Sequence, residues 1–255
     1  AGNSIETARL LLLSDSSMFP NGLANSSDQV GRNYMRHLTG SMYAWFDKPV
    51  NMHRGETMAG IIKDEVTHNP DRGFVGGYYM ETLALGPAFL AAFIEPGAWG
   101  PEFANWMDHY NKMAGMWIVG EDMPQATNRI TLSSTTDQWG LPVANVHFDD
   151  HPNDIAMREY AYEKAEALYN AVGAVGTHRT PPYPSTHNLG TCRMSANPED
   201  GVVDKWGRAH DVPNLFVSDG SVMTTGAAAN PTLTIVAHAI RQAEYLAGEL
   251  KAGNI

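Results

Sequence analysis

The chain begins with a run of apolar residues that shows no regular alternation. Positions 5–13 are largely apolar, which predicts a short buried helix followed by a buried strand. The next stretch, 14–28, is polar and contains Pro20, Asn21 and Gly22, so we expect a loop there. Aromatic and polar residues then mix in a strand-like way over 34–46.

The middle of the chain carries two helical patterns and one strand pattern. A segment rich in glycine, alanine and aromatic residues predicts a helix over 83–94. Polar and apolar residues alternate over 128–133, which predicts a strand. Apolar residues recur at helical spacing over 153–172, and Asn153 or Asp154 is a suitable N-cap for that helix.

The C-terminal seventy residues combine short elements with one long helix. Residues 214–218 predict a short buried strand, Asp219 and Gly220 a turn, and 224–229 a loop of small residues. Apolar residues at 233, 236, 240, 243, 246 and 250 predict a helix over 232–250. Asn230 would be its N-cap and Pro231 its first residue.

Composition narrows the class of protein. Of the 255 residues, 43% are hydrophobic and 18% are charged, as in globular proteins. The net charge of −11 argues against a nucleic-acid partner, and no apolar run is long enough to span a membrane. Cys192 is the single cysteine, so there is no internal disulfide, and the cellular compartment stays open between cytoplasm and periplasm.

Candidate chemistry gathers in two clusters near the C-terminus, at 185–194 and at 217–221 with 229–235. Taken alone, a loop histidine such as His187 is more often a surface or core residue than a catalyst. An Asn-Pro pair such as Asn230-Pro231 is usually a helix cap. His147, Asp149, Asp150 and His151 fit no familiar metal-ligand spacing, so we predict no metal site. Cys192 is expected to be a small buried residue.

Taken together, the two clusters and two further stretches resemble the glucose–methanol–choline (GMC) oxidoreductases. The opening AGNSIETARLLLLS is similar to a family signature that usually has proline at the place of Ala8. VGRNYMRH at 30–37 resembles a second segment, in which Arg36 replaces a common aspartate. HNLGTCRM at 187–194 and the block 214–235 resemble the segments that close the flavin site.

The resemblance implies an α/β fold combined with an α+β part. Residues 1–35 and 180–255 would belong to a Rossmann-like FAD-binding domain. Residues 36–179 would form a substrate-binding domain, an antiparallel sheet flanked by helices. The family's GxGxxG turn, which binds the FAD pyrophosphate, occurs nowhere in this chain. We therefore expect the N-terminal half, or a companion chain, to carry that motif.

The resemblance also implies roles for individual residues. His187 would be the catalytic base, since a histidine titrates near working pH, and Asn230 would orient the substrate. FAD is the implied cofactor, and the flavin-binding residues would be Asp219, Gly220, Asn230, Pro231 and Thr232. The N-terminus of helix 232–250 would stabilise negative charge that develops on the reduced flavin.

The function implied is FAD-dependent oxidation of a sugar, polyol or other alcohol, and a dehydrogenase is favoured over an oxidase. The residues of the motifs resemble those of bacterial dehydrogenases of the family. An electron-acceptor subunit is therefore a further expected partner. Two alternatives stay open at this point. One is a non-catalytic or sugar-binding subunit of a split flavoenzyme, and the other is a hydroxynitrile lyase, a branch of the family that performs no redox reaction.

Overall fold

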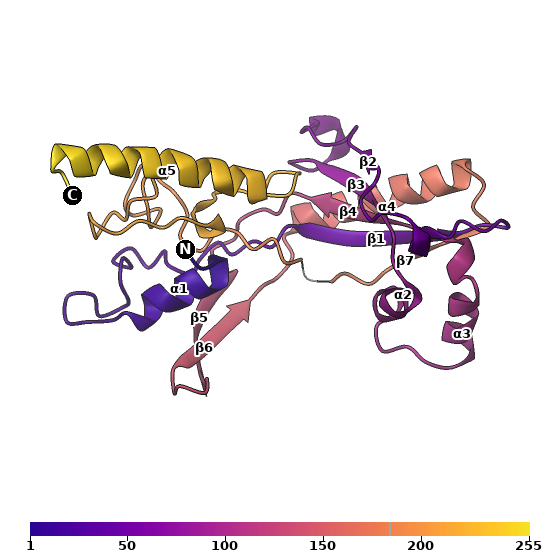
Figure 1. Ribbon diagram of the computed structural model, residues 1–255, viewed down its shortest axis with the longest axis horizontal. Coiled ribbons are helices and arrows are strands. Elements are labelled where there is room, and N and C mark those ends of the chain that lie inside the picture. Colours follow the sequence, from indigo (N-terminus) through magenta and orange to yellow (C-terminus); the bar gives the residue numbers. More distant parts are fainter. Residues whose placement is uncertain (184) are drawn as a thin grey trace.

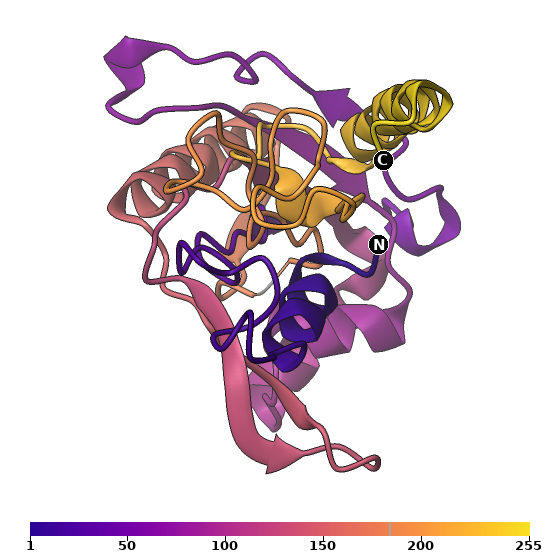
Figure 2. The same ribbon diagram turned by 90° about the vertical axis from the view of Figure 1, so that its left-hand side faces the viewer.

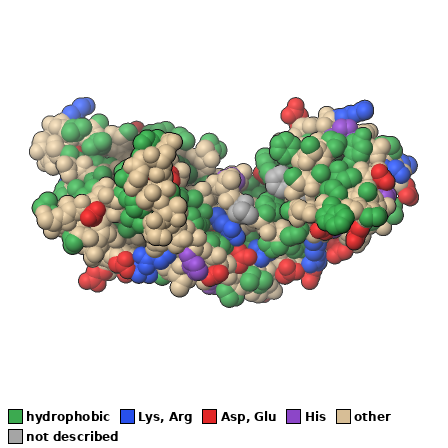
Figure 3. Space-filling model, turned by 90° about the horizontal axis from the view of Figure 1, so that it is seen from below, with side chains coloured by type: hydrophobic (Ala, Val, Ile, Leu, Met, Phe, Trp, Pro, Cys, Tyr) green, Lys and Arg blue, Asp and Glu red, His purple; other side chains and the backbone are tan. Residues whose placement is uncertain are grey.

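The computed structural model describes residues 1–183 and 185–255, which form two lobes (Figures 1 and 3). The sheet lobe contains a five-stranded antiparallel sheet of order β2-β3-β4-β1-β7. Its strands are β1 (Leu38–Trp45), β2 (Ile61–Ile62), β3 (Tyr78–Leu83), β4 (Met113–Gly120) and β7 (Gly176–Arg179). The loop lobe contains α1 (Ser4–Leu13), the hairpin of β5 (Arg129–Thr136) and β6 (Pro142–His147), and α5 (Thr232–Ala252).

Helices cover both faces of the sheet. On one face, α4 (Pro152–Ala171) buries Met157, Ala161 and Ala165 against Met42 and Ile118 of the strands. On the other face, α2 (Pro87–Ile94) and α3 (Pro101–Asp108) pack around a second apolar cluster that includes Tyr43 and Met113. Neighbouring residues of β1, such as Met42 and Tyr43, therefore serve opposite faces, as the two-residue period of a strand requires.

The loop lobe has its own apolar core, to which both ends of the chain contribute. Ala8 and Leu11 of α1 pack with Cys192 and Val217. The β5–β6 hairpin adds Ile130 to the same core, although it lies within the predicted substrate region 36–179. In Figure 2 the hairpin runs beside α1, and Figure 1 shows that it points away from the five-stranded sheet. Between β7 and α5 the described residues contain one regular element, the 3-10 turn η4 (Gly220–Val222).

Several predicted elements match the structure and several need correction. The strand predicted after the first helix is wrong, because α1 runs to Leu13; its N-cap Asn3 accepts from the backbone of Ile5 and Glu6. The helix predicted over 83–94 divides into the end of β3 and α2, since Gly86 and Pro87 begin a new helix. Residues 214–218 form no strand; Phe216 makes a single bridge with Arg208.

The two predicted helix caps also differ from the structure. α4 begins one residue earlier than expected, at Pro152, and its N-cap is His151, whose side chain accepts from the backbone of Asn153. The N-cap of α5 is Pro231, which offers no side-chain hydrogen bond, so Asn230 does not cap the helix.

Candidate active site

A cavity of about 370 Å³ opens at one end of the sheet, on the face that carries α2 and α3. Its floor consists of two rows of side chains, each formed by residues that pair across β3, β4 and β1. Val119 pairs with Thr39 and Tyr79, and Trp117 pairs with Ser41 and Glu81. Because side chains of one row stand on the same face of the sheet, these two rows place Thr39, Glu81 and Trp117 together at the cavity wall.

Segments from outside the sheet complete the wall. The loop after β7 contributes Tyr183, whose hydroxyl lies 2.7 Å from the hydroxyl of Ser41, and then Ser185 and His187. The loop before α5 contributes Asn230. The structure thus brings the two predicted catalytic residues, His187 and Asn230, to one cavity, although 43 positions separate them in the sequence.

His187 makes a close contact with a second histidine. Its Nδ1 lies 3.2 Å from Nδ1 of His37, and Nε2 of His37 lies 2.8 Å from the carbonyl oxygen of Ala227. His37 directly precedes β1, has a φ of +65° and is only 1% exposed. Ala227 belongs to the loop that ends at Asn230, so the histidine pair also ties that loop to the start of β1.

Burial keeps both histidines neutral near pH 7. Desolvation lowers the pKa of His37 to about 4, an effect that the hydrogen bond to Ala227 partly offsets. The pKa of His187 is lowered mainly by desolvation too, while the negative charge of Glu81 raises it. A neutral histidine has one nitrogen that can accept a proton, which is what a general base needs.

Glu81 is a buried carboxylate at the cavity wall. It is 4% exposed, and its Oε1 accepts a hydrogen bond of 2.9 Å from the hydroxyl of Tyr79. Desolvation raises the pKa of Tyr79, whereas a hydrogen bond from the backbone of Asn230 lowers it. No residue that the structure describes donates to Oε2 of Glu81. The wall therefore contains an unsatisfied acceptor, which costs free energy unless a donor reaches it.

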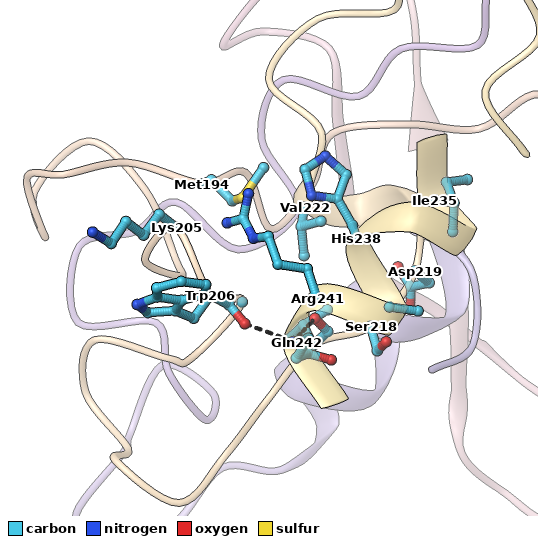
Figure 4. Close-up of a pocket in the computed structure, with 13 residues that line it drawn as sticks. Met194, Lys205, Trp206, Ser218, Asp219, Val222, Ile235, His238, Arg241 and Gln242 are labelled. Carbon is cyan, nitrogen blue, oxygen red and sulfur yellow. Dashed lines mark hydrogen bonds between the residues drawn. The ribbon is translucent and has the colours of Figure 1, made fainter. Parts of the chain in front are cut away.

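The N-terminus of α5 lies beside Asn230 with its first backbone N–H groups uncapped. Pro231 is buried and Thr232 is exposed, and the N-terminal end of a helix attracts negative charge. Gln242 anchors the helix, since its Nε2 donates to the carbonyl oxygens of Trp206 and Val217 at 3.0 and 2.8 Å. Figure 4 shows this anchor, with Arg241 beside Trp206 in a small pocket along the N-terminal half of the helix.

Asp219 and Gly220 serve the framework of the loop lobe. Oδ2 of Asp219 accepts from the Thr7 hydroxyl at 2.6 Å and from the backbone of Gly2 at 3.0 Å, while Oδ1 accepts from the backbone of Ser221. A Cβ on Gly220 would lie 2.8 Å from the carbonyl oxygen of Asn188, so glycine is needed for this packing. Their predicted part in flavin binding stays a prediction.

Sequence reasoning missed His37, Tyr79 and Glu81 as site residues. His37 ends the segment VGRNYMRH at 30–37, which resembles the family, but nothing in the sequence shows that its ring contacts that of His187. The signal for Glu81 is an acidic residue in a strand whose other five residues are all apolar, aromatic or Thr. A glutamate is rarely fully buried unless it is paired.

Other candidate chemistry lies away from the cavity. Cys192 is fully buried, as expected, and burial raises the pKa of its thiol to about 12. His147 and Asp149 contact each other on the surface, 3.1 Å apart. In the described ranges, 1–183 and 185–255, no three His, Cys, Asp or Glu residues gather as metal ligands would, and no helix has the length and apolarity to cross a membrane.

Comparison with known sequences decides the family. Residues 124–239 match the family model described as GMC oxidoreductase. The chain is 39% identical over 258 residues to the 2-methyl-1,2-propanediol dehydrogenase of Mycolicibacterium austroafricanum, covering 96% of this chain and 47% of that protein. The chain belongs to the GMC oxidoreductases. FAD is the cofactor of this family, as the resemblance implied.

Other relatives and solved structures agree. The chain is 32% identical to paromamine 6'-oxidase of Streptomyces fradiae, covering 98% of this chain and 45% of that protein. It is 30% identical to the fructose dehydrogenase large subunit of Gluconobacter japonicus, covering 99% and 47%. Pyridoxine 4-oxidase from Mesorbium loti has the same fold, with a TM-score of 0.66 at 18% identity over 95% of this chain and 50% of that one. The predicted fold class is confirmed. The chain spans about half the length of the curated relatives that it matches.

Proposed function

We propose that this chain forms the substrate side of an FAD-dependent enzyme that oxidises a CH–OH group of a small alcohol, polyol or sugar. The observation that carries the proposal is the meeting of His187 and Asn230 at one cavity, beside the uncapped N-terminus of α5. Oxidation of an alcohol to a carbonyl removes a hydride from carbon and a proton from oxygen. FAD, when bound, supplies the hydride acceptor.

The residues of this chain would handle the proton and the orientation of the alcohol. His187 would take the hydroxyl proton, since its lowered pKa keeps the ring neutral at pH 7. The side-chain amide of Asn230 would hydrogen-bond the same oxygen, which orients it without competing for the proton. Tyr183 and Trp117 wall the cavity and would reduce the access of water.

The described residues fit a flavin at the N-terminus of α5. The first N–H groups of the helix have no capping side chain, and Thr232 is exposed. An uncapped helix N-terminus suits the electron-rich pyrimidine side of a flavin. Asn230, Pro231 and Thr232 would lie closest to it, while Asp219 and Gly220 would support it from the framework behind.

The remaining part of the enzyme would pack on the outer side of α5. Leu233, Val236 and Ile240 are 83%, 48% and 57% exposed and lie on the side of the helix opposite Gln242. We name them the α5 stripe. A match to about half of each relative leaves the GxGxxG part of the enzyme to be supplied, either by the same protein or by a companion chain. We infer that this part covers the α5 stripe.

The cavity wall favours neutral or cationic alcohols over anionic ones. Glu81 is the one charged residue in it, and no lysine or arginine of the described chain lines it. The carboxylate of Glu81 at the wall suits a substrate with a second donor group, such as a neighbouring hydroxyl or an ammonium. The relative named for 2-methyl-1,2-propanediol makes that vicinal diol the first substrate to try. A dehydrogenase with a separate electron acceptor is favoured over an oxidase, in line with the same relative.

The test is anaerobic flavin reduction in the full-length, flavin-loaded enzyme and its His187→Gln variant. We expect substrate alcohols to bleach the flavin of the wild type, and the variant to do so about 100- to 10,000-fold more slowly, which is the usual contribution of a general base. His147→Gln is the matched control, because His147 is exposed and remote. A near-normal rate in His187→Gln would contradict the assignment. Cyanide release without bleaching would instead favour a hydroxynitrile lyase.

A further inference from the structure

The contact between His37 and His187 limits where the hydrogens of both rings can be. A carbonyl oxygen only accepts hydrogen bonds, so Nε2 of His37, 2.8 Å from the oxygen of Ala227, must carry a hydrogen. Because His37 is buried and neutral near pH 7, its Nδ1 then holds a lone pair. That lone pair faces Nδ1 of His187 at 3.2 Å.

The lone pair on His37 in turn sets the tautomer of His187. Two lone pairs facing each other at 3.2 Å would repel, whereas a hydrogen on Nδ1 of His187 makes a hydrogen bond. Neutral His187 with a hydrogen on Nδ1 has its lone pair on Nε2. A chain of two hydrogen bonds, from His187 to His37 to Ala227, therefore leaves Nε2 as the basic atom of His187.

We propose that His37 is a positioning residue that fixes His187 in the tautomer whose Nε2 is free to take the substrate proton. This inference rests on the proposed role of His187 as the base. When Nε2 of His187 takes the proton, the hydrogen on its Nδ1 stays in place. Nδ1 of His37 continues to accept the hydrogen bond from this N–H, which stabilises the imidazolium of His187. His37 does not remove the proton, because a positive charge on this buried ring is unfavourable.

Two neutral substitutions separate the two hydrogen bonds of His37. In His37→Asn, Oδ1 stands near the position of Nδ1 and can still accept from His187. In His37→Gln, Nε2 stands near the position of the histidine Nε2, so the bond to Ala227 is retained and the acceptor for His187 is lost. Asparagine also tolerates the φ of +65° at this position.

The first measurement is ¹⁵N NMR of histidine-labelled, flavin-loaded, full-length enzyme at pH 7.5 without substrate. We expect His187 to carry its hydrogen on Nδ1 in the wild type and in His37→Asn, and to lose that preference in His37→Gln. A wild-type His187 with its hydrogen on Nε2 would overturn the proposal. This readout requires no turnover, so it stands or falls separately from alcohol oxidation.

The second measurement is the rate of flavin reduction as a function of pH. We expect His37→Gln to be about 10- to 100-fold slower, the effect of losing one hydrogen bond to a charged group, and His37→Asn to be slowed less. Loss of the acceptor lowers the pKa of His187, because the imidazolium loses a partner; Glu81, the other charged group at the cavity wall, is unchanged. The rising limb of the profile should therefore move to lower pH in His37→Gln alone. Equal losses in both variants with an unmoved limb would show a purely structural role.

Discussion

α4 and α5 are nearly equal in length, 20 and 21 residues, yet they bury very different numbers of side chains. Seven residues of α4 are buried, among them Met157 and Ala165, whereas the one buried residue of α5 is Gln242. α4 packs against one face of the five-stranded sheet. α5 is held on one side by loops, and its apolar stripe faces outward. The comparison shows that α4 is packed into the core of its lobe, whereas α5 has one buried residue and exposes the α5 stripe.

The same contrast governs the candidate site. The sheet lobe supplies a fixed floor, Thr39, Trp117 and Glu81, whose positions follow from strand register. Loops supply His187 and Asn230, and individual hydrogen bonds hold these loops, such as the one from the backbone of Leu189 to the carbonyl of Met35 at 2.8 Å. Rigid elements that support functional loops are a common arrangement in enzymes. Substitutions in the two lobes should therefore have different consequences.

The largest effect on stability should come from shortening one apolar side chain on α4 or on α5 in the full-length, flavin-loaded enzyme. Met157→Ala removes a fully buried side chain and should cost about 2–5 kcal/mol. Ile240→Ala should cost a comparable amount if the rest of the enzyme covers the α5 stripe. Thermal unfolding measures both, with Glu163→Ala on the exposed side of α4 as the control. A neutral Ile240→Ala would show that the stripe is uncovered in the enzyme and that our inference about its packing is wrong.

An intermediate effect is expected from Glu81, on the sheet side of the cavity. In a matched series, HOCH₂–C(CH₃)₂–X with X as hydrogen, hydroxyl, ammonium or carboxylate, the wild type should favour hydroxyl and ammonium over hydrogen and reject carboxylate. The preference for ammonium over hydrogen should be about 10- to 100-fold in kcat/KM. Glu81→Gln should reduce it strongly, because the acceptor loses its charge.

Two controls test whether Glu81 causes this substrate preference. Glu163→Gln removes the same charge from an exposed position and should leave the series unchanged. If kcat/KM of the wild type is the same for the compound in which X is hydrogen as for the diol, Glu81 does not select substrates. This conclusion would hold whatever the result with Glu81→Gln. Absence of flavin reduction with every compound would instead question the proposed activity.

In both lobes, the sequence predicted elements with a regular local pattern better than segments held by long-range contacts, for a physical reason. The alternation over 128–133 and the helical spacing over 153–172 are local patterns, and both elements formed. Residues 214–218 are as apolar as a strand, but their backbone pairs at one bridge and otherwise packs among loops. His187 and Asn230 were found through resemblance. Contacts over long sequence separations, such as that of His37 with His187, depend on backbone geometry that no local pattern encodes.

The smallest expected effect concerns Asp122, at the junction of the lobes. Its carboxylate follows β4 and accepts a hydrogen bond of 2.8 Å from the backbone of Arg36, which precedes β1. Burial raises the pKa of Asp122 to about 7, and the nearby Asp154 adds to the effect. The folded protein therefore holds this proton more tightly than the unfolded chain, whose aspartate has its ordinary pKa near 3.8.

Stability should consequently depend on pH at this position. The contribution of Asp122 is fully present below about pH 4 and is lost as the pH rises through about 7, since the carboxylate must then ionise while buried. Asp122→Asn keeps an acceptor for Arg36 without the charge, so it should raise the melting temperature by a few degrees at pH 8, by less near pH 5, and hardly at all below pH 4. Asp47→Asn, at an exposed position, is the control. Asp154 is present in both proteins, so the difference between their melting curves reports Asp122 together with its interaction with Asp154. A difference that is constant from pH 5 to pH 8 would mean that this carboxyl does not titrate at the junction, and that the two lobes meet there through the hydrogen bond alone.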